Sequence, residues 1–145
     1  MATSLVGLIA FTGPVAAADE GTPAEAEALV KKAVAYIKAS GTDKAHAEFT
    51  SGNAFKDRDL YVFVVDFSGK ALAHGANAKL VRKDLMGLKD PDGKPVIKLT
   101  IDFAQRQGHG WTETVKFRTT DKIQLRRSYV ERVGETVVGS GVCED

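Results

Sequence analysis

The hydrophobic pattern of residues 23–40 predicts a long amphipathic helix. Thr22-Pro23-Ala24-Glu25 has the arrangement of a capping box with proline at the first helical position. After it, apolar residues recur at steps of three and four, which places them on one face of a helix: Ala26, Leu29, Val30, Ala33, Val34 and Ile37. Gly41 is a natural stop for this helix. We therefore expect a helix from about Pro23 to Ser40 and a shorter, weaker one over about residues 43–50.

From residue 60 onwards the pattern becomes that of β-structure. Residues 60–67 are almost all β-branched or aromatic, which predicts a central strand buried on both faces. Ser68-Gly69 is a tight-turn sequence, so residues 70–74 are expected to return as a hairpin partner. Three more strands and a second helix are expected further along the chain: strands over residues 111–118, 123–133 and 136–142, and the helix over residues 95–107.

The order of these elements predicts an α+β fold. A helix, a hairpin, a second helix and three consecutive antiparallel strands are typical of this class. We expect the long helix to cover one face of a five-stranded antiparallel sheet. The other face, under the loop of residues 75–89 and the second helix, would enclose any pocket.

Composition then excludes several classes of protein. The 145 residues are enough for one domain with a real core. A net charge of +1 gives no general electrostatic reason to bind nucleic acid. The single cysteine, Cys143, rules out a disulfide framework and any metal site built from several cysteines. No apolar run reaches the length of a membrane span.

The first 18 residues differ from the rest because they contain no charged side chain. An apolar segment, residues 5–11, is followed by Gly13-Pro14 and then by the small residues Val15-Ala16-Ala17-Ala18. This order is typical of a secretory signal with an Ala-x-Ala-like cleavage site. We therefore expect export to the periplasm, cleavage after Ala18 and a single mature domain over residues 19–145. The alternative is an apolar N-terminal helix packed on the domain.

No motif in the sequence indicates catalysis, a metal or a cofactor. There is no nucleophile elbow, no Ser/His/Asp order and no Cys/His pair. The three histidines lack metal-ligand spacing. Asp90-Pro91-Asp92-Gly93 superficially resembles a calcium loop, but its glycine falls at the fourth position, so we interpret it as a turn before a helix. We expect neither enzyme activity nor a bound cofactor.

Residues 126–132 offer chemistry for anion recognition. Strand alternation places Arg127 and Tyr129 on one side and Arg126 and Ser128 on the other. A guanidinium beside a tyrosine hydroxyl suits anion recognition, although a solvated charged strand face is an equal alternative. His74, at the end of the hairpin, is expected either to reach the inner face of the sheet or to be hydrogen-bonded at the strand end.

The stretch Leu60–His74 resembles the opening hairpin of a single Cache domain of the Cache_2 type. The resemblance continues, in order, through nearly all of residues 25–142, in the segments Asn77–Leu85, Leu88–Lys94, Gly110-Trp111, Ser128–Val130 and Val138–Val142. It implies an extracytoplasmic, PAS-like domain with a long N-terminal helix, a five-stranded antiparallel sheet and a pocket for a small ligand. Two positions depart from the family: Arg82 stands where glycine is frequent, and Cys143 stands where an aromatic residue often follows the Gly-Val of the final strand. We expect the second departure to alter the pocket floor.

The resemblance also implies which residues surround the ligand. By position they are Tyr61, Phe63, His74, Trp111 and Tyr129, with Arg127 or Lys83 as the charge partner. Aromatic walls with a few convergent polar groups suit a small carboxylate. For each aromatic residue, simple core packing is an equally good interpretation.

The resulting expectation is a stand-alone periplasmic sensor-type domain that binds a short organic acid or similar metabolite without catalysis, and that is related to chemotaxis and signal transduction proteins. The first alternative is an accessory subunit without a small ligand, which docks on a membrane sensor protein or forms a homodimer through the long helix. An apolar stripe left exposed on residues 26–37 would favour that alternative. The second alternative, an enzyme or haem-type redox module, requires a chromophore or a cluster of perturbed titratable groups.

Overall fold

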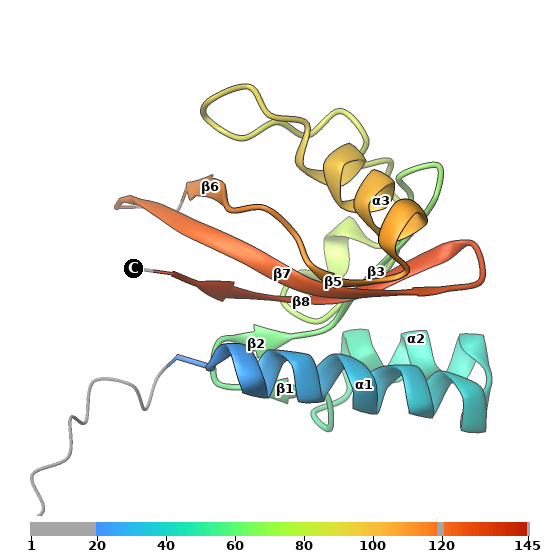
Figure 1. The fold of residues 1–145 in the computed structure, drawn as a ribbon. Coiled ribbons are helices and arrows are strands. Elements are labelled where there is room, and N and C mark those ends of the chain that lie inside the picture. Colours follow the sequence, from blue (N-terminus) through green and yellow to red (C-terminus); the bar gives the residue numbers. More distant parts are fainter. Residues whose placement is uncertain (1–19, 119–120, 145) are drawn as a thin grey trace, which may run out of the picture.

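Helices cover both faces of an antiparallel sheet in the computed structural model, which describes residues 20–118 and 121–144. The predicted export signal at residues 1–18 lies outside the described residues. The elements are α1 (Pro23–Ser40), α2 (Thr42–Ser51), β1 (Lys56–Asp57), β2 (Leu60–Tyr61), β3 (Phe63–Asp66), β4 (Ala71–His74), the 3-10 helix η2 (Ala78–Leu80), α3 (Val96–Gln107), β5 (His109–Trp111), β6 (Val115–Arg118), β7 (Ile123–Val133) and β8 (Thr136–Cys143). Figure 1 shows α1 and α2 on one face of the sheet and α3 on the other.

The main sheet has the order β4-β3-β8-β7-β5, and β6 also pairs with β7. Trp111 of β5 lies opposite Tyr129, and Val115 of β6 lies opposite Arg126, so β5 and β6 follow one another along the same edge of β7. Six strands therefore occupy five positions. The predicted α+β fold with a PAS-like sheet is confirmed, although the middle position belongs to β8 rather than to the strand that begins at residue 60.

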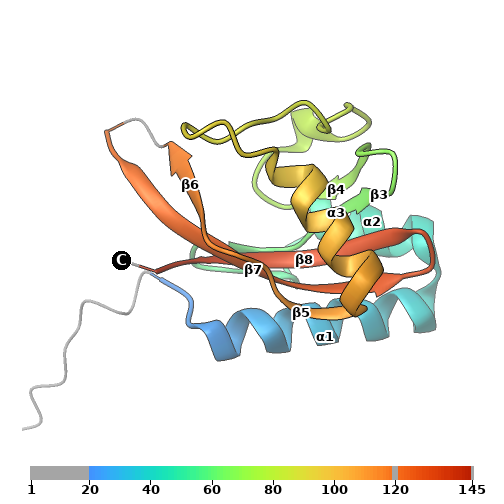
Figure 2. The same ribbon diagram turned by 45° about the horizontal axis from the view of Figure 1, so that its top comes forward.

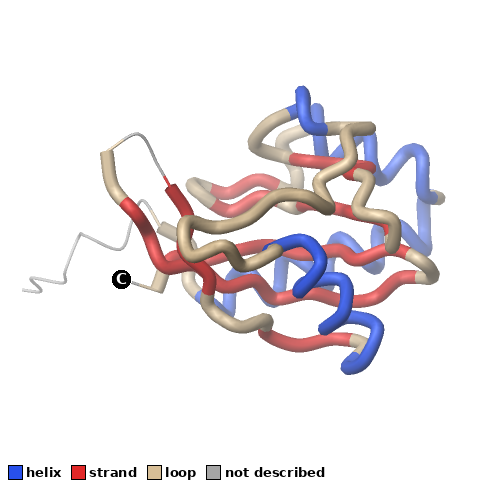
Figure 3. Tube along the Cα trace, turned by 90° about the horizontal axis from the view of Figure 1, so that it is seen from above, coloured by secondary structure: helices blue, strands red, loops and turns tan. Residues whose placement is uncertain are grey.

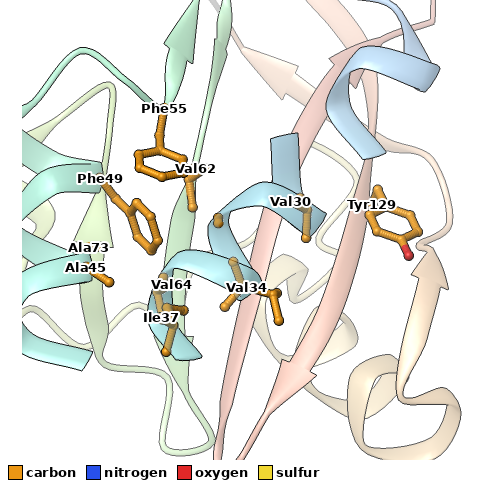
Figure 4. Close-up of a cluster of buried hydrophobic side chains, with 12 residues drawn as sticks. Val30, Val34, Ile37, Ala45, Phe49, Phe55, Val62, Val64, Ala73 and Tyr129 are labelled. Carbon is orange, nitrogen blue, oxygen red and sulfur yellow. The ribbon is translucent and has the colours of Figure 1, made fainter. Parts of the chain in front are cut away.

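The long helix α1 has the predicted bounds and the predicted cap. The Glu25 N–H donates to Thr22 Oγ1 (3.2 Å), and the Thr22 N–H donates to Glu25 Oε1 (3.4 Å). The apolar stripe of the helix is buried against the sheet: Ala26, Val30, Ala33, Val34 and Ile37. Figure 4 shows part of this core, with side chains of α1 beside those of α2, β3 and β7. The sheet thus covers most of the stripe, and the exposed apolar stripe that would favour docking through this helix is not found on the described residues 26–37.

The opposite face of the sheet carries a smaller core under α3. Val64 lies opposite Val138 and packs in the α1 core, whereas Val65 lies opposite Val137 and packs in the core with Ile101 and other α3 side chains. This alternation explains why the strand from residue 60 reads as apolar throughout, because both of its faces are covered. Figure 2 shows α3 crossing β7 and β8 on this side.

Two predicted strands are interrupted. The segment from residue 60 divides into β2, which pairs with β1 in a separate two-stranded sheet, and β3, which belongs to the main sheet. The segment from residue 111 divides at Thr112, whose hydroxyl oxygen accepts the Ser128 N–H (3.1 Å) in place of a carbonyl. A side chain that substitutes for the backbone in this way breaks the regular ladder. Within residues 20–118 and 121–144, no helix is both long and apolar enough to span a membrane.

Candidate functional site

A cavity of about 720 Å³ lies between the sheet and α3, on the face opposite α1. Its walls come from β2, β3, β4, β6, β7, β8, α3 and the loops of residues 75–95, and Figure 3 shows these loops and α3 over the sheet. The volume is within the range of small-molecule sites. We call it the α3-side cavity. Its lining is mostly apolar, with polar or charged groups at Tyr61, His74, Asn77, Lys89, Asp90, Thr100, Lys116, Arg118, Arg126 and Ser128.

The floor of the α3-side cavity is made by strand residues that share one face of the sheet. Phe63 and Val65 come from β3, Arg126 and Ser128 from β7, and Gly141 from β8. Gly141 lies opposite Ser128 across the β7–β8 ladder, so the missing side chain leaves space beside the serine. The floor is therefore apolar on the β3 side and polar on the β7 side.

The Asp90 turn closes one side of the cavity and is fixed by its own carboxylate. Asp90 Oδ1 accepts the N–H groups of Asp92 (2.9 Å) and Lys94 (2.8 Å), and Oδ2 accepts the Lys116 N–H (3.3 Å). Burial acts to raise the pKa of Asp90, but these hydrogen bonds and the Lys94 charge outweigh it and lower the pKa. Asp90 therefore stays ionised and ties the turn to β6. The sequence predicted a turn before a helix at this position, and the structure has one before α3.

Arg126 is the cationic group best placed to meet a ligand. Its side chain is half-buried, its Nη2 donates to the Gly141 carbonyl (3.3 Å), and its guanidinium lies 5.2 Å from the Phe117 ring centroid. Among the described residues, no carboxylate forms an ion pair with it. A guanidinium has five N–H donors, so Arg126 retains donors for a carboxylate.

Other charges around the cavity favour an anion. Lys116 Nζ pairs with Asp92 (3.0 Å), and Lys89 and Arg118 are exposed at the rim. The lining thus has four permanent cations, Lys89, Lys116, Arg118 and Arg126, and a single carboxylate, Asp90, which is engaged in its turn. This excess of positive charge raises the local concentration of anionic ligands.

His74 provides a neutral donor at the β4 end of the cavity. Its Nδ1 accepts the N–H groups of Asn77 (2.9 Å) and Ala76 (3.3 Å), which places the proton of the neutral ring on Nε2. Burial lowers the pKa of His74, so the ring is neutral at pH 7. The Tyr61 ring lies against it, with 4.9 Å between ring centroids. Both residues line the cavity, so His74 does reach the inner face of the sheet.

The structure brings together only some of the residues expected at the ligand. Tyr61, Phe63 and His74 line the α3-side cavity. Lys83 lies outside it, with an exposed side chain, and its carbonyl accepts the Ala71 N–H (3.0 Å). Cys143 is not among the cavity residues either; its Sγ lies 3.5 Å from Gln124 Oε1, so the expected effect on the pocket floor is not found.

Trp111, Arg127 and Tyr129 lie on the α1 face of the sheet, and the expectation that they share the cavity with Tyr61 is corrected. The Arg127 guanidinium stacks over the Trp111 ring (4.5 Å to its centroid) and pairs with Glu144. The Trp111 ring contacts that of Tyr129, whose hydroxyl donates to Glu131 Oε2 (3.2 Å). Burial, with the Glu131 carboxylate, raises the pKa of Tyr129 to about 12. These side chains form a connected series of contacts on the α1 face of the sheet.

Arg126 is the cavity residue that the sequence interpretation passed over. Alternation had correctly separated Arg126 from Arg127, and the two are adjacent residues on opposite faces of β7. The sequence does not show which face of β7 carries the cavity. That follows from the pairing of β7 with β8 and of β8 with β3, which places Arg126 on the same face as Val65. Within the described ranges, no three His, Cys, Asp or Glu side chains gather to hold a metal ion.

Comparisons with known proteins agree with this architecture. The methyl-accepting chemotaxis protein McpP of Pseudomonas putida is 30% identical over 95 residues, which is 61% of this chain and 17% of that protein. A solved chemotaxis protein from Vibrio parahaemolyticus superposes with a TM-score of 0.67 at 24% identity, over 84% of this chain and 88% of that one. A Cache chemosensory domain solved to explain carboxylic acid recognition superposes with a TM-score of 0.63 at 20% identity, over 82% and 86% of the two chains.

The two structural likenesses concern the fold, and the chain spans less than a fifth of its chemotaxis relative. The family assignment comes from the sequence profile described as single Cache domain 2, which matches residues 4–144. That match covers the whole of the described sheet, its helices and the α3-side cavity. The chain therefore belongs to the single Cache domain 2 family and is a Cache sensor domain.

Proposed function

We propose that this protein is a periplasmic sensor domain that binds a small organic acid in the α3-side cavity and performs no catalysis. The observation that carries the proposal is Arg126, a half-buried guanidinium that lines the cavity and has no carboxylate partner among the described residues. Burying part of a charge is costly unless it is paired, and a carboxylate ligand supplies the pair. Ser128, on the same face of β7, adds a hydroxyl.

The related proteins support an acid as the ligand class. One solved Cache domain with this fold recognises carboxylic acids, and the curated relative is a methyl-accepting chemotaxis protein. Chemotaxis receptors are membrane proteins that detect external molecules, which agrees with the export signal predicted at residues 1–18. The chain spans only 17% of that relative. We therefore propose that this chain passes its signal to a partner, either a membrane sensor protein or a second copy of this chain.

A thermal-shift screen tests the proposal. Small carboxylic acids such as acetate, propionate, pyruvate and lactate, together with longer ones, are compared with the amides of the same acids. An acid present at a hundred times its dissociation constant should add about 2.7 kcal/mol to the free energy of unfolding. The matching amide, which lacks the charge, should add far less. Equal effects of acid and amide, or no effect of any acid, would contradict the proposal.

A further inference from the structure

The α3-side cavity is much larger than a two- or three-carbon acid. Its volume of about 720 Å³ corresponds to roughly two dozen water molecules at about 30 Å³ each. Acetate or lactate would replace only about five of them and would leave most of the apolar lining in contact with water. The cavity thus offers apolar surface that a short acid cannot use.

Two polar groups of the cavity, His74 and Arg126, lie far apart on the sheet. Phe63 pairs with His74 on one side and with Gly139 on the other, whereas Arg126 pairs with Cys143, four residues further along β8. At about 3.3 Å per residue and 4.8 Å between strands, His74 and Arg126 are separated by roughly 13 Å along the sheet and 14 Å across it. A short acid held by Arg126 therefore does not reach His74.

The β3 side of the cavity floor is apolar. It is formed by Phe63 and Val65, and Val65, which pairs with Val137, lies further from Arg126 than Phe63, which pairs with Gly139. Leu85, Val96 and Ile97 lie on the loop and α3 side. The charged residues of the lining come from β6, from β7 and from the loop at residues 89–90, which Asp90 ties to β6. Such a surface gains most from an apolar ligand body that displaces water along its length.

We infer that the acid bound here is elongated and amphipathic, with its carboxylate at Arg126 and an aliphatic or aromatic body, on the order of ten non-hydrogen atoms in total, that lies over Phe63 and extends towards Ile97. Octanoate and 3-phenylpropionate are acids of this size. The inference rests on the proposed function, because it assigns the chemical class of the acid to the same cavity.

Calorimetric titration of the protein with acetate, butanoate, hexanoate and octanoate tests the inference. If the body lies in the apolar part of the cavity, affinity should rise by roughly two- to fourfold with each added methylene. Octanoate should therefore bind at least about tenfold more tightly than butanoate. 1-Octanol, which has the same body without the carboxylate, serves as the neutral control and should bind more weakly than octanoate.

Two variants of α3 locate the body. Ile97→Ala removes a cavity side chain and should weaken octanoate binding several-fold with little effect on butanoate. Leu99→Ala, on the same helix but outside the cavity lining, should change neither affinity. If the short acids bind and the affinity stays constant or falls as the chain lengthens, the inference is overturned and the proposed function stands. Failure of every acid to bind, short or long, would overturn the proposed function itself.

Discussion

The ring of Phe63 lies over Gly139 of the neighbouring strand, and the two residues are directly paired across β3 and β8. An ideal Cβ added to Gly139 would be 2.5 Å from Phe63 Cζ, which is too close for any real contact. Glycine at this position therefore lets an aromatic side chain lie flat on the floor of the α3-side cavity. The shape of the site depends on this pair as much as on its charged residues.

Gly139→Ala should displace the Phe63 ring and destabilise the domain. Overpacking of a filled site of this kind costs about 1–3 kcal/mol, and chemical denaturation measures the loss. The matched control is Gly87→Ala, because a Cβ at Gly87 meets no atom within 4 Å and that residue has no positive φ. Equal stabilities of the two variants would contradict the assigned packing.

Arg82→Gly should stabilise the protein. Arg82 has a φ of 75°, in the left-handed region that costs a side chain about 1–2 kcal/mol. Glycine avoids that cost but loses about 0.5–1 kcal/mol through the greater freedom of the unfolded chain, so the expected net gain is up to about 1.5 kcal/mol. Lys83→Gly, at the next residue and without a positive φ, should instead be destabilising. A loss of stability in Arg82→Gly would show that the side chain makes a compensating interaction.

Ser140→Ala should leave stability unchanged or raise it. Ser140 is fully buried, and its hydroxyl has no hydrogen-bond partner among the described residues. An unsatisfied buried hydroxyl costs about 1–3 kcal/mol, which alanine removes. Thr136→Val provides the contrast, because the Thr136 hydroxyl donates to the Val133 carbonyl (2.7 Å) and its removal should be destabilising. Comparable losses in thermal unfolding for both variants would contradict this account.

Stability should fall as the pH is lowered from 7.5 to 5.5. Burial lowers the pKa of both His46 and His74, with the Asp43 charge partly opposing this at His46. The unfolded chain binds protons near pH 6.5, whereas the folded domain does so only at lower pH, so the stabilisation present above pH 6.5 is lost below it. His74→Gln should reduce this pH dependence in urea titrations. A domain that is equally stable at both pH values would contradict lowered pKa values at these two half-buried histidines.

The elements that could be predicted were those whose local residue pattern is compatible with only one type of secondary structure. The capping box and stripe fixed α1 at Pro23–Ser40, and alternation fixed β7 at Ile123–Val133, as the structure has them. The breaks at Val62 and Thr112 were not predictable, because each depends on which partner strand the segment meets. β2 leaves the main sheet to pair with β1, and the Thr112 hydroxyl replaces a backbone acceptor for Ser128.

The site was predictable only in part because both faces of the sheet are covered. Tyr61 and His74 were expected at the ligand, and the structure places them on the cavity wall. The structure places Arg126 in the cavity and Arg127 on the α1 face, and a strand with two buried faces does not show in its sequence which face carries the cavity. Only the pairing of distant strands, β7 with β8 and β8 with β3, decides that question.

The central claim is that Arg126 holds the carboxylate of an acid in the α3-side cavity. The most direct test is the dissociation constant of the tightest-binding acid, measured by calorimetry for Arg126→Ala and Arg127→Ala. Loss of a charge-assisted hydrogen bond of about 1.5–3 kcal/mol predicts binding roughly ten- to a hundredfold weaker in Arg126→Ala. Arg127→Ala removes the same charge from the α1 face and should leave the affinity unchanged. Unchanged binding in Arg126→Ala, or an equal loss in both variants, would contradict the claim.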